Sequence, residues 1–227
     1  MFSAVILAGG KGERVGAIKQ LLPLYEPLAN TTMLDLVLQQ YQTVENIQEI
    51  IVVANRDVQD QIVDVCRRYP GVKRVVPGCS TRRRSAYKGV QAVSGQYVLI
   101  HDVARPIVCT RTVQACMNML EEGYTAVNTV WIPPENSVFL ANHRMTGVAP
   151  RGAVGSGQCP QGFHTQKLLE VQEEASEDER EFNDECSLML EYTGCVVGYV
   201  EGSPDGMKVT VREDLDLIRY YLQRRRA

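Results

Sequence analysis

The sequence has no long apolar segment and no basic leader. Its first residues are apolar, but this run ends at Gly9, whereas a membrane-spanning helix needs about 20 consecutive apolar residues. A secretory signal peptide begins with basic residues, and none precedes the apolar start. We therefore expect neither a signal peptide nor a membrane span, and we expect a cytoplasmic protein.

The cysteines and histidines lack the spacings of metal-binding motifs. The chain has 7 cysteines without a C-x-x-C pair, and its histidines, His101, His143 and His164, form no H-x-x-x-H pair. The odd number and the spacing of the cysteines argue against a disulfide framework and against a zinc site. We expect reduced thiols, several of them in the core. A magnesium ion that arrives with phosphate groups is compatible with this composition.

An excess of basic charge is absent as well. The formal net charge is -3 and the sequence pI is about 5.7, so we expect no general affinity for nucleic acid or anionic membranes. Internal repeats and low-complexity linkers are also missing. With 227 residues and 44% hydrophobic content, the chain is long enough for one large domain. We interpret residues 1–227 as a single domain in which basic residues act locally.

Short apolar runs alternate along the chain with segments of helical period, which predicts an α/β fold with a mostly parallel sheet flanked by helices. The expected strands are 5–7, 50–54, 72–76, 97–100, 126–131 and 195–200. The expected helices are 33–42, the segment from Asp57 to before Pro70, the segments around 87–93 and 215–222, and 112–122, 166–175 and 184–192.

Residues 132–157 break this alternation. They contain a predicted hairpin between 137 and 148, with Asn142-His143 near its turn. A two-stranded projection is at best marginally stable alone in water. We therefore expect a projecting β-arm that packs against another subunit.

The first strand runs into a glycine-rich loop. Glycines occupy positions 9, 10, 12 and 16, and basic residues occupy positions 11, 14 and 19. Glycines let backbone N–H groups approach a ligand closely. The spacing matches neither the dinucleotide motif G-x-G-x-x-G nor the Walker motif. The loop is either a plain turn at a strand end or a phosphate-binding loop, and the basic residues favour phosphate.

Two further loops follow strands of the same predicted sheet, and they begin at Gly78 and Asp102. Ligands of open parallel sheets bind beyond the carboxyl ends of the strands. We therefore expect Gly9, Gly78 and Asp102 to meet at one crevice. Asp102 is either a structural cap or an oriented carboxylate for a metal or a ribose.

Charged runs occur at two other places. Three arginines, 82–84, lie near a predicted helix start, where the helix dipole disfavours cations, so this placement suggests a ligand. For Arg83 and Arg84 themselves we expect a solvated turn, and we expect the acidic stretch 177–181 to be a solvated loop.

Seven motifs occur in the order seen in one enzyme family. They are Leu7-Ala-Gly-Gly with Gly12-x-Arg14 and Lys19-Gln20, Gly78-x-x-x-Arg82-x-x-Ser85, His101-Asp-x-Ala-Arg-Pro106, Arg151, Cys159-Pro-Gln161-x-Phe163, Asp184-Glu-x-Ser187 and Lys208-Val-Thr210. Together they resemble the cytidylyltransferases that make CDP-alcohols from CTP. That family includes the 2-C-methyl-D-erythritol 4-phosphate and the ribitol 5-phosphate enzymes, and the resemblance spans nearly the whole chain.

The resemblance implies a Rossmann-like nucleotidyltransferase fold, a homodimer whose exchanged arms complete each other's sites, and Mg²⁺ bound with the triphosphate. The CTP-binding residues it implies are Ala8, Gly9, Gly10, Gly78, Arg82, Ser85, Asp102 and Val103, with Asp102 also next to the metal. The catalytic residues it implies are Arg14, Lys19, Arg151 and Lys208. The residues it implies for the acceptor phosphate are Arg105, Ser137 and Asn183, together with Arg151.

The implied reaction is an in-line attack of an acceptor phosphate oxygen on the α-phosphorus of CTP, with pyrophosphate as the leaving group. Because two anions must be brought together, cations and positioning matter more than a base. Lys19 and Arg14 are the leading candidates for stabilising the transition state. We favour 2-C-methyl-D-erythritol 4-phosphate as the acceptor, for isoprenoid precursor synthesis. The alternatives are ribitol 5-phosphate, for a cell-surface polymer precursor, and a non-catalytic nucleotide-binding protein.

Several positions depart from the family pattern. The loop before Lys19 is shorter and lacks a proline, Ser137 and Asn183 replace threonines, and Cys79 replaces a glycine. We expect the shorter loop to weaken closure of the site around the triphosphate. We expect the changed phosphate-binding residues to affect which acceptor is used. The identity of the acceptor is therefore open at the level of sequence.

Overall fold

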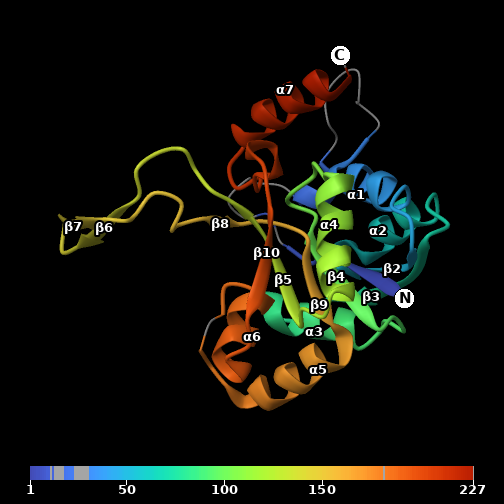
Figure 1. Cartoon of the computed structure of the whole chain (residues 1–227). Coiled ribbons are helices and arrows are strands. Elements are labelled where there is room, and N and C mark those ends of the chain that lie inside the picture. The colour runs from blue at the N-terminus through green and yellow to red at the C-terminus, as the bar shows by residue number, and fades with distance from the viewer. Residues whose placement is uncertain (11, 13–17, 23–30, 181, 227) are drawn as a thin grey trace.

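A computed structural model describes residues 1–10, 12, 18–22, 31–180 and 182–226 of the chain, and Figure 1 shows its course. The strands are β1 (Phe2–Ala8), β2 (Ile47–Ala54), β3 (Val72–Pro77), β4 (Tyr97–Asp102), β5 (Ala126–Trp131), β6 (Val138–Ala141), β7 (Arg144–Val148), β8 (Ser156–Gly157), β9 (Gln161–His164) and β10 (Val197–Glu201). The α-helices are α1 (Met33–Tyr41), α2 (Gln59–Cys66), α3 (Arg82–Val90), α4 (Thr110–Glu121), α5 (Thr165–Glu174), α6 (Glu185–Thr193) and α7 (Asp214–Arg226). Short 3₁₀ helices are η1 (Lys19–Leu21), η2 (Arg56–Val58), η3 (Ala175–Glu177) and η4 (Pro204–Gly206).

The central sheet has the strand order β10-β5-β9-β4-β1-β2-β3, and β8 pairs with β5. Neighbouring strands are parallel except at β9 and β8, which are antiparallel to their partners. The predicted α/β fold with a mostly parallel sheet is therefore confirmed. The sequence did not predict β9, because its four residues contain only one large apolar side chain, Phe163.

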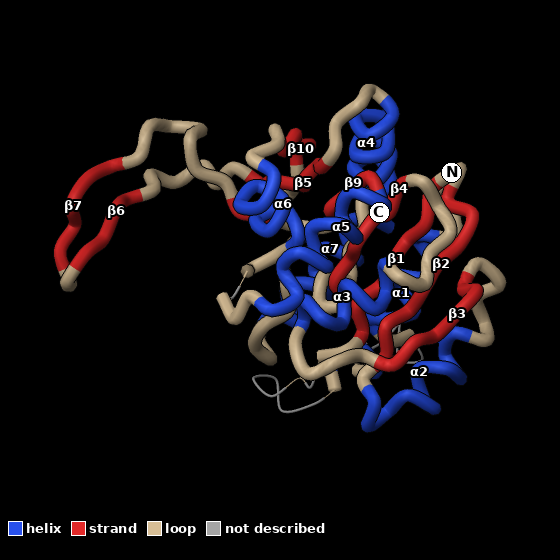
Figure 2. The backbone as a smooth tube through the Cα atoms, turned by 90° about the horizontal axis from the view of Figure 1, so that it is seen from below, coloured by secondary structure: helices blue, strands red, loops and turns tan. Residues whose placement is uncertain are grey.

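Helices cover both faces of this sheet, as Figures 1 and 2 show. Every residue of β1 is buried, because successive side chains enter opposite layers of the core. Phe2, Ala4 and Ile6 pack in the layer formed with α1, α2, α4 and α7. Val5 and Leu7 pack in the layer formed with α3, α5 and α6. The continuous apolar run at the start of the sequence is thus a strand buried on both faces.

Side-chain caps fix where the helices next to the sheet begin. The sequence Asn-Thr-Thr at 30–32 predicts an N-cap for the helix that follows. Thr32 and Asp35 form a capping box at the start of α1, which confirms this prediction. The sequence also predicts that Asp57 caps the helix that follows it. This prediction is wrong, because the side chain of Asn55 accepts a hydrogen bond from the Asp57 N–H and caps η2. Asn55 directly follows β2 with an extended backbone, and its N–H donates to Ala8 O.

The first four strands of the sheet end at the same edge. In the register of the sheet, Ala8 lies beside Ala54 and Ala54 lies beside Pro77, while Leu7 lies beside Asp102. The loops that follow β1, β3 and β4 therefore leave the sheet side by side. This arrangement confirms the predicted convergence of the loops at Gly9, Gly78 and Asp102.

The segment between β5 and β8 projects away from the body of the protein, as Figures 1 and 2 show. It carries the two-stranded sheet β6-β7, whose turn residues Asn142 and His143 have positive φ angles of 49° and 59°. Two left-handed residues are what a tight hairpin turn requires, so the predicted hairpin is confirmed. Leu140 on this arm is 72% exposed. The packing of the arm against another subunit stays a prediction.

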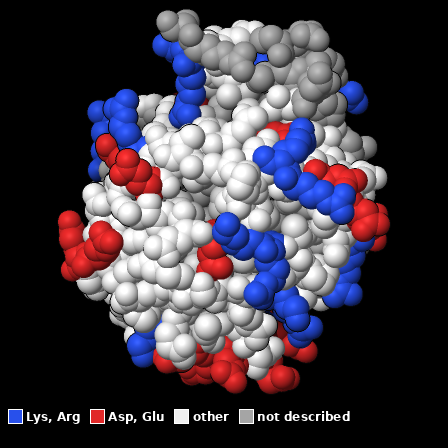
Figure 3. All heavy atoms as spheres, turned by 90° about the vertical axis from the view of Figure 1, so that its right-hand side faces the viewer, with Lys and Arg blue, Asp and Glu red and all other residues white. Residues whose placement is uncertain are grey.

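The surface and the thiols agree with the composition. Figure 3 shows a face on which Lys and Arg side chains lie beside Asp and Glu side chains. All seven cysteines are free, and Cys66, Cys116 and Cys186 are buried. Among the helices of the described residues, none is both long and apolar enough to span a membrane.

Candidate active site

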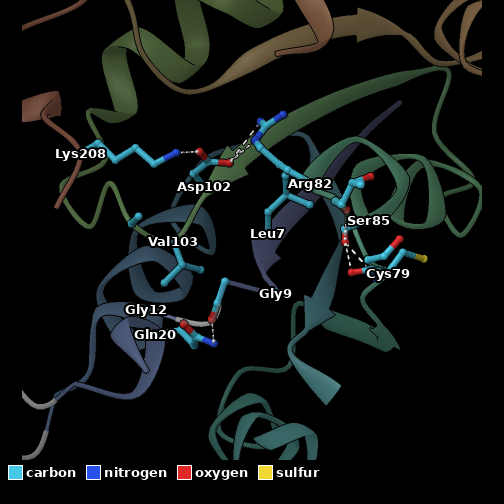
Figure 4. A pocket seen from close by; sticks show the side chains of 14 residues that line it. Leu7, Gly9, Gly12, Gln20, Cys79, Arg82, Ser85, Asp102, Val103 and Lys208 are labelled. Carbon is cyan, nitrogen blue, oxygen red and sulfur yellow. Dashed lines mark hydrogen bonds and ion pairs between the residues drawn. The ribbon is translucent and has the colours of Figure 1, made fainter. Parts of the chain in front are cut away.

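A pocket of about 430 Å³ opens at the carboxyl edge of the sheet, and Figure 4 shows the side chains that line it. Its lining residues come from the loop after β1, the start of α3, the end of β4 and the loop before α7: Leu7, Gly9, Gly10, Gly12, Gln20, Cys79, Ser80, Thr81, Arg82, Ser85, Asp102, Val103, Ala104 and Lys208. A volume in this range suits a small organic ligand.

Gly9 and Gly10 form one edge of the pocket, called here the glycine edge, and the space around them is open. A Cβ at Gly10 would meet no described atom within 4 Å, and one at Gly9 would meet only Ser85 Oγ at 3.9 Å. Packing among the described residues therefore does not require glycine here. The open space leaves room for a ligand to approach the backbone.

Two buried side-chain amides hold the glycine edge in place. Gln20 Nε2 donates to the Gly10 carbonyl at 3.0 Å, and Asn55 Nδ2 donates to the same oxygen at 3.2 Å. Both side chains are buried. Because they fix this carbonyl from η1 and from the end of β2, the backbone of Gly10 is ordered before any ligand arrives.

The start of α3 forms the opposite wall. Thr81 caps the helix by accepting a hydrogen bond from the Arg84 N–H. Ser85 Oγ accepts from the Cys79 N–H at 2.9 Å and donates to Thr81 O at 2.8 Å. Behind this turn a Cβ at Gly78 would come within 3.0 Å of Ala54 O, so glycine is required there by packing and does not itself imply contact with a ligand.

Two cations hold the Asp102 carboxylate. Lys208 Nζ lies 2.7 Å from Asp102 Oδ2, and Arg82 Nε donates to Asp102 Oδ1 at 3.2 Å, as Figure 4 shows. Burial favours the neutral acid, but Arg82 and Lys208 outweigh it and hold the pKa of Asp102 well below its usual range. Asp102 is therefore ionised at neutral pH.

Arg82 in turn bridges Asp102 to a second acid. Its NH1 donates to both carboxylate oxygens of Glu185, each at 2.9 Å. Burial opposes the guanidinium charge, but Glu185 and then Asp102 more than offset it, so the pKa of Arg82 is raised. Burial raises the pKa of Glu185, and Arg82 works against that rise.

The loop after β4 is held from behind by His101. Its two ring nitrogens lie 3.2 Å from Tyr41 Oη and 2.9 Å from Arg105 O. A neutral ring satisfies both contacts if Nε2–H donates to the carbonyl and Tyr41 donates to Nδ1. Burial lowers the pKa of His101 to about 4, so the ring is neutral at pH 7 and acts in positioning the loop.

The structure brings seven of the fifteen predicted site residues into one pocket. Those that line it are Gly9, Gly10, Arg82, Ser85, Asp102, Val103 and Lys208. Ala8 and Gly78 are buried beside it. Arg14 and the side chain of Lys19 lie outside the described part of the chain. The roles of all these residues in ligand binding stay predictions.

Four predicted residues do not line the pocket of a single chain. Arg105 donates to the Gly206 and Gly157 carbonyls, so it ties together the loops around β8 and η4. Ser137 and Arg151 lie at the two ends of the β6-β7 hairpin, where Arg151 is exposed, and Asn183 lies just before α6. None of these four residues is among the described residues that line the pocket.

Sequence reasoning missed several residues of the site. The lining residues that it did not assign to the site are Leu7, Gly12, Gln20, Cys79, Ser80, Thr81 and Ala104. Gln20 and Glu185 stood inside quoted motifs, and Thr81 carried the signal of an N-cap before a helix. The contact of Glu185 with Arg82 joins positions 103 residues apart and has no local signal.

The predictions of a solvated turn at Arg83 and Arg84 and of a solvated acidic loop at 177–181 are partly wrong. Arg84 is exposed, but Arg83 NH2 donates to Asp178 O at 2.8 Å, and its guanidinium lies 5.9 Å from the centroid of the Phe182 ring. The Asp178 side chain is 15% exposed, and it accepts hydrogen bonds from Tyr192 and Arg180. Contacts between distant segments give these residues the partners that a charge run alone does not predict.

The side chains of the pocket suit a metal ion that takes most of its ligands from the substrate and from water. Among the described residues no group of three or more His, Cys, Asp and Glu side chains could hold a metal ion, and Asp102 is the one carboxylate among the described lining residues. Mg²⁺ commonly binds through one or two carboxylates together with substrate phosphates and water. The pocket therefore fits a Mg²⁺ ion that arrives with a triphosphate.

Comparisons with known proteins agree over nearly the full length of the chain. The family model "IspD: 2-C-methyl-D-erythritol 4-phosphate cytidylyltransferase" matches residues 2–224. A relative of that name from Bacillus mycoides is 30% identical over 226 residues, which are 98% of this chain and 98% of the relative. A bifunctional IspD/IspF enzyme from Allorhizobium ampelinum is 30% identical over 95% of this chain, and the chain spans only 54% of that longer protein.

Solved structures show the same similarity. The 4-diphosphocytidyl-2C-methyl-D-erythritol synthase of Anaerococcus prevotii superposes with a TM-score of 0.87 at 27% identity, covering 98% of this chain and 96% of that one. The 2-C-methyl-D-erythritol 4-phosphate cytidylyltransferase of Thermus thermophilus gives a TM-score of 0.75 at 25% identity, covering 96% of this chain and 98% of that one.

Proposed function

This chain belongs to the 2-C-methyl-D-erythritol 4-phosphate cytidylyltransferase family, and we propose that it transfers CMP from CTP to 2-C-methyl-D-erythritol 4-phosphate. An acceptor phosphate oxygen forms a bond to the α-phosphorus, and the bond from that phosphorus to the bridging oxygen of the β-phosphate breaks. The products are a CDP-alcohol and pyrophosphate. The observation that carries this proposal is the pocket that joins the open glycine edge to the Asp102–Lys208 pair.

Different residues of the pocket would bind different parts of CTP. The backbone at Gly9 and Gly10 offers space and polar groups to one side of the nucleotide, and the turn at Ser85 closes the other side. Lys208 carries the positive charge that phosphates need. Because charge spreads over the phosphorus oxygens in the transition state, a fixed cation there lowers the barrier. From the sequence we assign the same task to Arg14 and Lys19.

Asp102 would hold the Mg²⁺ ion that accompanies the triphosphate. When bound, Mg²⁺ neutralises phosphate charge and makes pyrophosphate a better leaving group. The protein contributes an ionised carboxylate whose two oxygens are already oriented by Arg82 and Lys208. No side chain of the pocket is needed as a nucleophile, because the acceptor phosphate supplies the attacking oxygen. We expect this chemistry in the cytoplasm, where CTP is made.

The acceptor is tested by a coupled pyrophosphate assay with CTP and Mg²⁺. We expect release with 2-C-methyl-D-erythritol 4-phosphate at a kcat/KM at least about 10²-fold above that with ribitol 5-phosphate or glycerol 3-phosphate, since a site built for one polyol leaves polar groups unpaired with another. A preference for ribitol 5-phosphate would contradict the proposed acceptor. CTP binding without release for any acceptor would favour the non-catalytic alternative.

We also propose that the active form is a homodimer in which each β6-β7 arm covers the partner. The arm exposes Val138, Phe139, Leu140, Met145 and Val148, and an apolar projection of this kind is unstable unless it packs against something. The partner's arm would then bring Ser137 and Arg151 to the acceptor phosphate. This arrangement accounts for their distance from the pocket within one chain.

Leu140→Glu should shift the protein from dimer to monomer, because it places a charge in the apolar contact. Sedimentation velocity at micromolar concentration measures the shift, and kcat/KM for the acceptor should fall with it. Val196→Glu is the matched control, since Val196 is 77% exposed outside the arm. A Leu140→Glu protein that stays dimeric would argue against the arm as the dimer contact.

A further inference from the structure

Glu185 is a buried acid outside the pocket. It is the first residue of α6, it is 1% exposed, and both of its carboxylate oxygens accept from Arg82 NH1. A buried carboxylate is costly unless a cation and hydrogen bonds compensate it. Asp184 and Ser187 form a capping box that fixes the start of α6, so the position of Glu185 is determined by the helix that carries it.

Glu185 ends a row of four alternating charges. Arg82 lies between Glu185 and Asp102, with NH1 on the first acid and with Nε and NH2 on the second. Lys208 takes the remaining oxygen of Asp102. The four groups come from α6, α3, the end of β4 and the loop before α7. The arrangement leaves Asp102 with two cationic partners and Arg82 with two acidic ones.

The pair Asp102–Lys208 and the pair Asp102–Arg82 would respond differently to a bound nucleotide. The Lys208 side chain is 36% exposed and lies in the pocket wall, so a triphosphate competes with Asp102 for its ammonium group. Once Lys208 turns toward phosphate, the orientation of Asp102 depends on Arg82. Arg82 would also be attracted by the triphosphate, and Glu185 is the group that holds it back.

We propose that Glu185 is a positioning residue for the nucleotide site: it retains Arg82 on Asp102, so that Asp102 keeps its orientation while Lys208 engages the phosphates. This inference rests on the proposed function, because it assigns Asp102 and Lys208 to the metal and the triphosphate. Glu185 itself does not touch the substrate. Its effect reaches the pocket through the Arg82 guanidinium.

The test replaces Glu185 with glutamine, which keeps the shape and removes the charge. We expect kcat to fall about tenfold or more and the Mg²⁺ concentration for half-maximal activity to rise about tenfold, the usual range for a residue that orients a metal-binding group. The KM for CTP at saturating Mg²⁺ should change less than kcat, because the backbone at Gly9 and Gly10, Ser85 and Lys208 are intact and the cluster becomes more positive. Glu191→Gln is the matched control, since Glu191 is an exposed acid on the same helix.

A purely structural role for Glu185 would give a different result. If Glu185→Gln lowered thermal stability but left kcat and the Mg²⁺ dependence within about twofold of the parent protein, the positioning role would be overturned. If Glu185→Gln does not fold, Glu185→Asp replaces it, because a shorter acid keeps the charge but cannot keep both contacts. For that variant we expect partial loss of kcat with the same rise in the Mg²⁺ requirement, and parent-like values would overturn the proposal.

Different results would contradict the proposed function and the inference about Glu185. Calorimetric titration of CTP, with and without Mg²⁺, reports on Asp102 without any turnover. If the parent protein transfers CMP to none of the acceptors, the proposed function fails, and Glu185→Gln must still lower the Mg²⁺-dependent part of CTP binding. If the parent protein is active and that part is unchanged in Glu185→Gln, only the inference about Glu185 fails.

Discussion

Lys208→Ala is expected to lower kcat/KM for CTP by about 10²-fold, which corresponds to about 2.7 kcal/mol of transition-state stabilisation. Lys208 Nζ lies in the pocket wall at 2.7 Å from Asp102, where it can follow the charge that develops on the phosphorus oxygens. Its loss also leaves Asp102 with Arg82 as its cationic partner among the described contacts. Steady-state pyrophosphate release at saturating acceptor measures the effect.

The matched control for this variant is Lys167→Ala. Lys167 is exposed on α5 and pairs only with Glu170 three residues away among the described contacts, and such surface pairs contribute little. We expect unchanged kinetics for the control and partial activity for Lys208→Arg, which keeps the charge with a different shape. A Lys208→Ala enzyme within about threefold of the parent kcat/KM would remove Lys208 from the catalytic group.

Asp102→Asn is expected to cost about 10²- to 10³-fold in kcat/KM, the equivalent of about 3 to 4 kcal/mol, in the range found when one preorganised group that stabilises the transition state is removed. Asparagine keeps the shape of the side chain but loses the charge that holds Arg82 and Lys208. It also replaces one of the two carboxylate oxygens available to Mg²⁺ with an NH₂ group. The measurement is kcat/KM as a function of Mg²⁺ concentration, and we expect the requirement for Mg²⁺ to rise as the rate falls.

Asp64→Asn on α2 is the control, because Asp64 forms an exposed pair with Arg67. The double variant Asp102→Asn, Lys208→Ala adds a sharper criterion. Groups in direct contact are not additive, so the double variant should lose clearly less than the product of the single losses. Strict multiplication of the two losses would mean that Asp102 and Lys208 act independently, contrary to the geometry.

The parts of the fold that the sequence predicted are those with a local cause. Val5, Ile6 and Leu7 predict a buried strand because all three are apolar and β-prone, and Thr32 predicts a helix start because its hydroxyl can cap the helix. The hairpin turn at Asn142-His143 is local in the same way. The convergence of Gly9, Gly78 and Asp102 followed from the parallel order of the strands alone.

The parts that the sequence did not predict depend on distant contacts. β9 is a strand because β4 and β5 offer it hydrogen bonds on both sides, although its own residues show no strand pattern. Arg83 is half-buried because its guanidinium donates to Asp178 O and lies over the Phe182 ring. The sequence presents Glu185 as an ordinary acid in the first turn of a helix, where the dipole favours it. Only the contact between the start of α6 and the start of α3 gives it Arg82 as a partner.

The residues that the family resemblance implies for the acceptor phosphate are the hardest to explain from the sequence. Ser137 and Arg151 stand on a projecting arm, and Asn183 stands before α6. A single chain does not bring them together with the pocket. We propose that their task depends on a second copy of the chain, which neither a local pattern nor the fold of one copy would reveal.

The central claim is that the pocket between Gly9-Gly10 and the start of α3 binds the nucleotide. The most direct test is a crystal structure of the protein with CTP and Mg²⁺. We predict CTP in this pocket, with its triphosphate within hydrogen-bonding reach of Lys208 and its metal next to Asp102. A saturating concentration of CTP that leaves this pocket without nucleotide, or that places CTP elsewhere on the chain, would contradict the claim.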